Sequence, residues 1–194
     1  MCKYVGCSNK CPYNKCSNKP SKNHKYILKK KNNGPLDLFS KCKNNLTLLV
    51  FEAPGIDEWK NGEPVSSHRK GSAAYKFNEE LQKQGKNRQN YDIVEAVRCF
   101  PGTSTKTDNQ KDPKELKNAA KCCQKYLERA LKAKSYTKIV CFGEVAKDSV
   151  SSVVKTFIKQ NNQHYTIEYL KESVICLTHP MHSKTLSKDI GSNL

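Results

Sequence analysis

The chain is short of acidic residues and has no long apolar run. It holds 18 Asp and Glu against 35 Lys and Arg, which gives a formal net charge of +17 at pH 7. No apolar stretch approaches the roughly 20 residues that a membrane-spanning helix needs. Residues 1–7 lack the apolar core of a signal peptide. We therefore expect a cytoplasmic protein that makes no membrane contact, and we interpret the charge as a surface field that attracts a polyanion.

Cysteine, by contrast, is abundant, with ten residues in 194. In a reducing compartment this number favours a metal or cluster site over a disulfide framework. Five of the ten lie in residues 1–45, a segment rich in Lys, Asn and Ser with little periodicity. No internal repeat is visible. We expect one domain over residues 1–194, with a cysteine-rich N-terminal segment (1–45) and a core (46–194).

From residue 46 onward, apolar runs alternate with helical patterns. Strands are predicted over residues 46–51, 91–99, 138–142, 165–170 and 174–177. Helices are predicted over residues 72–84, from residue 113 onward, and over residues 144–159. The second helix carries an apolar stripe at helical spacing, formed by Leu116, Ala119, Cys123, Leu127 and Ala130. Strands that alternate with helices predict a parallel sheet with helices on both faces, and therefore an α/β fold.

Two of the predicted strands end abruptly in unusual loops. Residues 48–51 run into Glu52-Ala53-Pro54-Gly55, and residues 174–177 run into a loop that holds His179-Pro180. Because ligands of open parallel sheets bind where strands end in loops, we expect these two loops to face one cleft. A carboxylate on one loop and an imidazole on the other suit acid–base chemistry.

Five segments, in a fixed order, resemble motifs of one enzyme family. They are Phe51-Glu52-Ala53-Pro54-Gly55 with Glu58, Gly62 and Pro64; Val94-Glu95-Ala96-Val97-Arg98-Cys99; Cys123-Gln124-Lys125-Tyr126-Leu127-Glu128; Lys138-Ile139-Val140-Cys141-Phe142-Gly143 with Ala146; and His179-Pro180. The family is that of the iron–sulfur (family 4 type) uracil-DNA glycosylases. The resemblance implies a three-layer αβα sandwich around a mainly parallel sheet, and we expect a monomer. It also implies a [4Fe–4S] cluster and excision of a base that has been flipped out of DNA.

The resemblance assigns the four cluster ligands. Cys99 and Cys123 match the last two ligands of the family, and Cys7 and Cys11 are the expected N-terminal pair, with Cys16 and Cys2 in reserve. The N-terminal spacing departs from the family's Cys-x-x-Cys, and a zinc site is the alternative because zinc also accepts four thiolates.

The resemblance also assigns roles in catalysis. Glu52 is expected to orient water, with Asp57 and Glu58 as alternatives, and His179 to donate to the base carbonyl O2 as negative charge develops there. The alternative for Glu52 is a turn residue that binds local backbone amides. Base contacts are expected from Phe51, Ala53, Pro54, Gly55, Val65 and Glu95. DNA contacts are expected from Lys106, Lys111, His182, Ser183 and Lys184.

Three departures from the family pattern bear on the substrate. Phe51 replaces the first Gly of the motif, Val65 replaces a Phe that stacks on uracil, and Glu95 replaces the Asn that reads uracil. A protonated carboxyl group offers one donor and one acceptor, which suits cytosine, and Val65 leaves room for a substituent at the 5-position. An ion pair with a nearby Lys or Arg is the alternative for Glu95, which is expected on the same strand face as Val97.

These observations favour a glycosylase that excises a modified (5-substituted) cytosine. Some members of this superfamily resemble antiviral defence enzymes that excise hypermodified viral cytosines, which fits this prediction. The alternatives are an ordinary uracil-DNA glycosylase of base-excision repair and a non-catalytic DNA-binding protein on the same scaffold.

Overall fold

The computed structural model describes residues 36–101, 113–161 and 174–194. Its elements follow in the order β1 (Thr47–Phe51), α1 (Ile56–Asn61), α2 (Ala73–Lys83), the 3-10 helix η2 (Arg88–Asn90), β2 (Asp92–Glu95), α3 (Pro113–Ala133), β3 (Lys138–Phe142), α4 (Glu144–Asn161), β4 (Val174–Leu177) and α6 (Leu186–Asn193). The four strands form one sheet in the order β2-β1-β3-β4, and every pair is parallel. The strand predicted over residues 165–170 lies outside the described residues.

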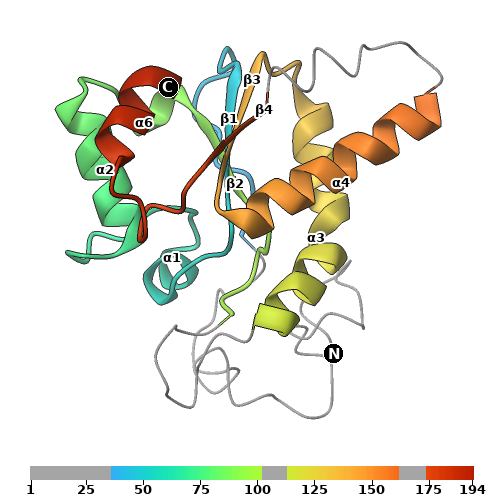
Figure 1. Cartoon of the computed structure of the whole chain (residues 1–194), viewed down its shortest axis with the longest axis horizontal. Helices are drawn as coiled ribbons and strands as arrows, with labels where there is room; N and C mark the ends of the chain where they lie inside the picture. Colours follow the sequence, from blue (N-terminus) through green and yellow to red (C-terminus); the bar gives the residue numbers. More distant parts are fainter. Residues whose placement is uncertain (1–35, 102–112, 162–173) are drawn as a thin grey trace.

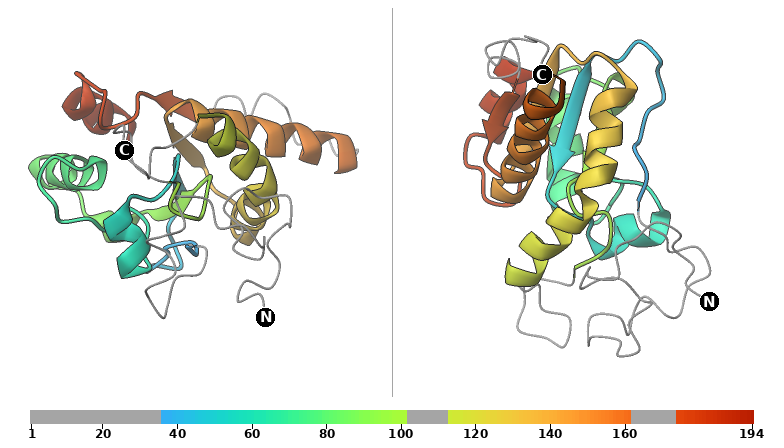
Figure 2. Two further views of the ribbon diagram at one scale, coloured as in Figure 1. Left: turned by 90° about the horizontal axis from the view of Figure 1, so that it is seen from below. Right: turned by 90° about the vertical axis from the view of Figure 1, so that its right-hand side faces the viewer.

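Helices cover both faces of the sheet, which confirms the predicted α/β architecture (Figure 1). On one face, α3 and α4 close a core that includes Leu48, Val50 and Val94. On the other face, α2 and α6 close a second core that includes Leu49 and Ile93. Figure 2 shows the same three layers from two further directions. The two helical layers remove both faces of β1, β2 and β3 from water, whereas the edge strand β4 is half-buried and its Cys176 is exposed.

Several element boundaries match the sequence prediction because local signals fix them. β3 is predicted to the residue, and all five residues of the predicted α3 stripe are buried. The Ser72 side chain accepts a hydrogen bond from the backbone N–H of Tyr75 and begins α2. After α2, the chain turns at Gly85, whose φ of +66° suits glycine.

β2 is shorter than the predicted strand over residues 91–99. It ends at Glu95, although the backbone N–H groups of Ala96 and Val97 still donate to the carbonyls of Phe51 and Glu52. Val97 packs with Val94 in the α3/α4 core, so the prediction that it shares a face with Glu95 is wrong. Side chains alternate between the two faces of a sheet only within a strand, so the alternation does not continue past Glu95.

A buried carboxylate fastens the start of β2 to two neighbouring loops. The Asp92 carboxylate lies 2.7 Å from Lys134 Nζ, accepts from Tyr136 Oη at 2.7 Å, and accepts from Asn45 Nδ2 at 3.1 Å. Burial by itself raises the pKa of Asp92, but these hydrogen bonds and one from Ser40 outweigh it and hold the pKa below its usual value. This group therefore stabilises the edge of the sheet opposite the two predicted loops.

Candidate active site at the carboxyl edge of the sheet

Glu52 follows β1 directly, and its side chain reaches the end of β3. Its Oε1 accepts a hydrogen bond from the backbone N–H of Val145 at 3.3 Å, at the first turn of α4. A Cβ atom placed on Gly143 would lie 2.6 Å from the same oxygen, so only glycine leaves room for the carboxylate. One partner of the Glu52 carboxylate is therefore an amide that lies far along the chain, at the start of α4. The partial positive charge at the start of α4 favours a carboxylate there.

His179 lies two residues after β4, and the turn around it orients its ring. The His179 carbonyl accepts from the backbone N–H groups of His182 at 2.8 Å and Ser183 at 3.1 Å. The His179 Nδ1 accepts from the backbone N–H of Met181 at 3.3 Å. Because an accepting ring nitrogen carries no proton, the neutral ring holds its proton on Nε2. The imidazole is thereby a hydrogen-bond donor through Nε2.

Gly143 connects the two loops. The Glu52 carboxylate packs against Gly143 from the β1 side. The backbone N–H of Gly143 donates to the carbonyl of Leu177, the last residue of β4, at 3.0 Å. Glu52 and the segment that carries His179 therefore flank the same residue at the carboxyl edge of the sheet. Figure 1 shows α1 below this edge, directly after β1. The sequence predicts that both loops lie at this edge, and the structure places them there; the sequence does not indicate the bridging role of Gly143.

A buried carboxyl group fastens the loop after β1 to the next segment. Glu58 is 6% exposed and accepts from the backbone N–H groups of Glu58 itself, Ser67 and Gly55, while burial raises its pKa. A Cβ atom on Gly55 would lie 2.6 Å from Glu58 Oε2. Nearby, Asp57 accepts from Ser67 Oγ at 2.9 Å and pairs with Arg69 Nε at 3.3 Å. Both carboxylates that were alternatives to Glu52 therefore hold residues 55–58 against residues 67–69.

The three residues that depart from the family pattern gather on the α2/α6 side of the sheet. Glu95 is opposite Phe51 in the strand register and is 4% exposed. The Phe51 ring stacks on Phe142, with ring centroids 4.5 Å apart, and meets Phe77 edge-on at 5.1 Å. Val65 belongs to the same apolar cluster. The side chains of Phe51 and Val65 are thus core side chains behind the carboxyl edge.

Val65 also has an unusual backbone conformation, with φ of +53°. A positive φ is strained for a β-branched residue, so the surroundings must hold it. Its carbonyl accepts a hydrogen bond from Asn78 Nδ2 at 3.0 Å. Nothing in the sequence signals this conformation.

The remaining predicted contacts lie on either side of the two loops. In the loop after β1, Pro54 is buried, Ala53 is half-buried, and Gly55 is exposed at the N-terminus of α1. His182 and Lys184 are exposed beside His179. The Ser183 hydroxyl accepts from the backbone N–H of Thr185 and donates to Asp189, within the turn that begins α6. Lys106 and Lys111 lie outside the described residues.

Two of the expected cluster ligands lie on neighbouring elements. Cys99 is 5% exposed and Cys123 is 4% exposed. Arg98 lies over the ring of Tyr126, 4.3 Å from its centroid, and Tyr126 is one helical turn beyond Cys123. The backbone N–H of Leu36 donates to the Arg98 carbonyl at 2.7 Å, so the chain enters the described region directly beside Cys99.

The other expected ligands, Cys2, Cys7, Cys11 and Cys16, lie outside the described residues. Within residues 36–101, 113–161 and 174–194, no three His, Cys, Asp or Glu side chains converge as a metal site. Two buried thiols on adjacent elements fit half of a four-thiolate site, provided that the remaining ligands come from residues 1–35.

Comparisons with known proteins agree with this geometry at the level of the family. No helix in the described part of the chain combines the length and the apolar character needed to cross a bilayer. A search of curated proteins found no matching relative. The family model described as "Uracil DNA glycosylase superfamily" matches residues 39–188, a range that includes both loops and Cys99 and Cys123. The chain therefore belongs to the uracil DNA glycosylase superfamily.

Proposed function

We propose that this chain is a DNA glycosylase that hydrolyses the N-glycosidic bond of a base extruded from DNA. One observation carries the proposal: the Glu52 carboxylate and the His179 loop flank Gly143 at the carboxyl edge of the sheet. Superfamily membership supports the reaction class. The net charge of +17 supports a polyanionic substrate.

The proposed reaction uses each group for one task. Glu52 orients a water molecule toward C1′ of the sugar and accepts its proton as the water oxygen bonds to C1′. The C1′–N bond breaks, and its electron pair leaves with the base. The Nε2–H of His179 donates to the base carbonyl O2, where negative charge develops, and thereby stabilises the leaving group. The base anion then takes up a proton from water, and Glu52 releases its proton to water. The products are a free base and an abasic site.

Alkali-labile abasic sites in incubated DNA test this proposal. Glu52→Gln and His179→Ala should each lower the rate by about 100-fold or more, since a positioned acid or base contributes roughly 10²–10⁴. Asp148→Asn, an exposed carboxylate on α4, is the matched control and should retain the wild-type rate. Absence of abasic sites with every DNA substrate would leave the non-catalytic DNA-binding alternative.

For the substrate, we propose a 5-substituted cytosine, with a role in antiviral defence. In its protonated form, the Glu95 carboxyl can donate to cytosine N3 and accept from the N4 amino group. Its position supports this proposal, because Glu95 is the last residue of β2 and therefore lies at the carboxyl edge of the sheet, opposite Phe51 in the register. Glu95→Asn should shift the preference toward uracil, as measured by excision from matched uracil and modified-cytosine DNA. Efficient uracil excision by the wild type, with no activity on modified cytosine, would identify an ordinary uracil glycosylase instead.

We further propose that Cys99 and Cys123 bind a [4Fe–4S] cluster together with two of the N-terminal cysteines. When bound, the cluster would tie the N-terminal segment to the sheet, a structural role that needs no redox step. Iron and acid-labile sulfide in anaerobically purified protein should fall in Cys99→Ser and Cys123→Ser but not in Cys122→Ser, the half-buried neighbour on α3. Zinc without sulfide in the wild type would contradict the assignment.

A further inference from the structure

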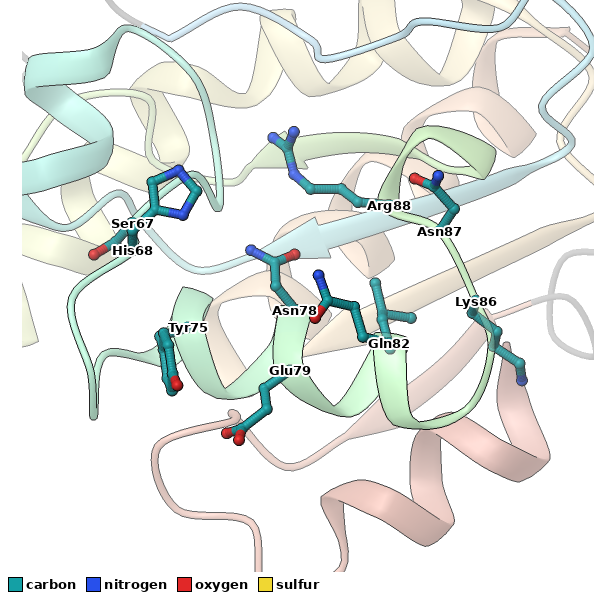
Figure 3. Close-up of a pocket in the computed structure, with 10 residues that line it drawn as sticks. Ser67, His68, Tyr75, Asn78, Glu79, Gln82, Lys86, Asn87 and Arg88 are labelled. Atoms are coloured by element: carbon teal, nitrogen blue, oxygen red, sulfur yellow. The ribbon is translucent and has the colours of Figure 1, made fainter.

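The cations of the pocket on the α2 side of the sheet are already bound within the chain. The pocket encloses about 490 Å³, and Figure 3 shows Lys86 and Arg88 in its lining. Arg88 pairs with Glu63 at 2.6 Å, and Lys86 donates to the carbonyl of Ile190 at 3.0 Å. An anionic ligand would have to displace these contacts. Groups that can react without losing a partner lie instead on the α3/α4 side of the sheet, where two thiols meet.

Cys141 of β3 and Cys176 of β4 are register partners on adjacent parallel strands. Residues paired in this way point to the same face of the sheet. That face is the α3/α4 face, since Cys141 lies in its core and Val174, two residues before Cys176, packs against it. A hydrogen bond joins the two thiols. Neighbouring strands are about 4.8 Å apart and the Cα atoms of a disulfide about 4.4–6.8 Å apart, so the pairing brings the two cysteines within disulfide range.

The two thiols differ in their access to solvent. Cys176 is exposed on the edge strand of the described sheet, whereas Cys141 is 0% exposed. Burial, together with the neighbouring Cys176, raises the pKa of the Cys141 thiol. Oxidation of a cysteine by a dissolved peroxide requires exposure and thiolate character, so Cys176 is the residue that meets the oxidant first. Cys141 is shielded from the oxidant but in contact with its neighbour.

We propose that Cys141 and Cys176 are a peroxide-reactive pair that forms a reversible disulfide between β3 and β4. The Cys176 thiolate attacks hydrogen peroxide: an S–O bond forms, the O–O bond breaks, and the hydroxide that leaves takes up the proton lost by the thiol. The Cys141 sulfur then attacks the Cys176 sulfur: an S–S bond forms, the S–O bond breaks, and the leaving hydroxide takes the Cys141 proton. Two thiols are thereby oxidised to one disulfide, and the peroxide is reduced to two molecules of water.

This disulfide would join the two strands that lead into the candidate active site. Cys141 lies two residues before Gly143, and Cys176 lies three residues before His179. Cys176 also precedes Leu177, whose carbonyl accepts from the Gly143 N–H. A bond between the sulfurs would therefore fasten β4, and the loop that follows it, to β3. Because Cys176 is exposed, a thiol reductant can reach the bond, and exposed disulfides are the labile ones.

Peptide mapping of the full chain by mass spectrometry tests the proposal. Trypsin places Cys141 and Cys176 in different peptides, residues 139–147 and residues 172–184, neither of which holds another cysteine. The protein is treated with hydrogen peroxide, its remaining thiols are blocked with N-ethylmaleimide, and it is digested without reductant. We expect the two peptides to be linked, and the link to be lost when dithiothreitol is added before blocking.

Single variants test the order of the two steps. Cys141→Ser should stop at a sulfenic acid on Cys176, which dimedone traps, and Cys176→Ser should leave Cys141 unmodified. Cys42→Ser, which removes an exposed cysteine before β1, is the matched control and should keep the link. Absence of the linked peptides from the oxidised wild type, or linkage of Cys176 only to some other cysteine, would overturn the proposal. Oxidation of Cys141 in Cys176→Ser would overturn the assignment of Cys176 as the residue that reacts first.

Discussion

Replacement of Gly143 by alanine tests the geometry of the site without changing a proposed catalytic group. A Cβ atom at this position would lie 2.6 Å from Glu52 Oε1, 2.7 Å from its Cδ and 2.9 Å from its Cγ. Real Cβ atoms do not approach other atoms so closely, so the Glu52 carboxylate must move away from Val145. We expect the rate of base excision to fall by about 100-fold or more, because a catalytic group has lost its position.

Alanine at position 143 also strains the backbone, and a control variant separates this strain from the displacement of Glu52. Gly143 has a φ of +96°, and a strained conformation of this kind costs an L-residue about 1–3 kcal/mol. Gly85 has a φ of +66°, and a Cβ atom there meets nothing within 4 Å. Gly85→Ala should therefore lower the stability in urea unfolding by a comparable amount and leave the excision rate unchanged. A Gly143→Ala variant that excises bases as fast as Gly85→Ala would refute the proposed position of Glu52.

Three further predictions concern the surroundings of the site. Glu58→Ala should lower the free energy of unfolding in urea by about 1–3 kcal/mol, because buried backbone N–H groups lose their acceptor. Glu58→Gln should lower it by less, and equal losses in the two variants would contradict the role of Glu58 as that acceptor. The pKa of Asp92 is lower in the folded than in the unfolded chain, so its carboxylate stabilises the fold fully above the unfolded pKa of about 4. This contribution to the free energy of unfolding is lost as the pH falls below that value. Urea unfolding measured between pH 7 and pH 3 should show the loss in the wild type and not in Asp92→Asn. Phe77→Ala should cost about 3–5 kcal/mol, because its ring packs against both Phe51 and Phe142, and a loss below about 1 kcal/mol would show that the aromatic cluster is not needed for stability.

Local signals explain why much of the fold could be predicted from the sequence. The apolar run over residues 138–142 and the glycine after it determine β3 and the start of α4. The capping serine and the terminal glycine determine α2 to within one residue at each end. Two α-helices and the 3-10 helix η2 escaped prediction, because α1 has only six residues, α6 only eight and η2 only three, and such short helices depend on tertiary packing.

The site could be predicted only in part, because its details depend on contacts between distant segments. The sequence places Glu52 and His179 at strand ends, and parallel pairing brings those ends to one edge. It does not show that Glu52 binds an amide 93 residues further along the chain. Nor does it show that the carbonyl of Val65 needs Asn78, since a positive φ at valine contradicts its local preference. The glycine after β3 is the signal that could have indicated the close approach of Glu52.

Release of a base from DNA by the two loops beside Gly143 can be measured by mass spectrometry. The bases freed from uracil-containing, unmodified and 5-substituted-cytosine DNA are identified after incubation with the protein. We expect a free 5-substituted cytosine with the wild type and none with Glu52→Gln. An identical release of bases by the wild type and Glu52→Gln, or no release from any of the three DNAs, would contradict this expectation.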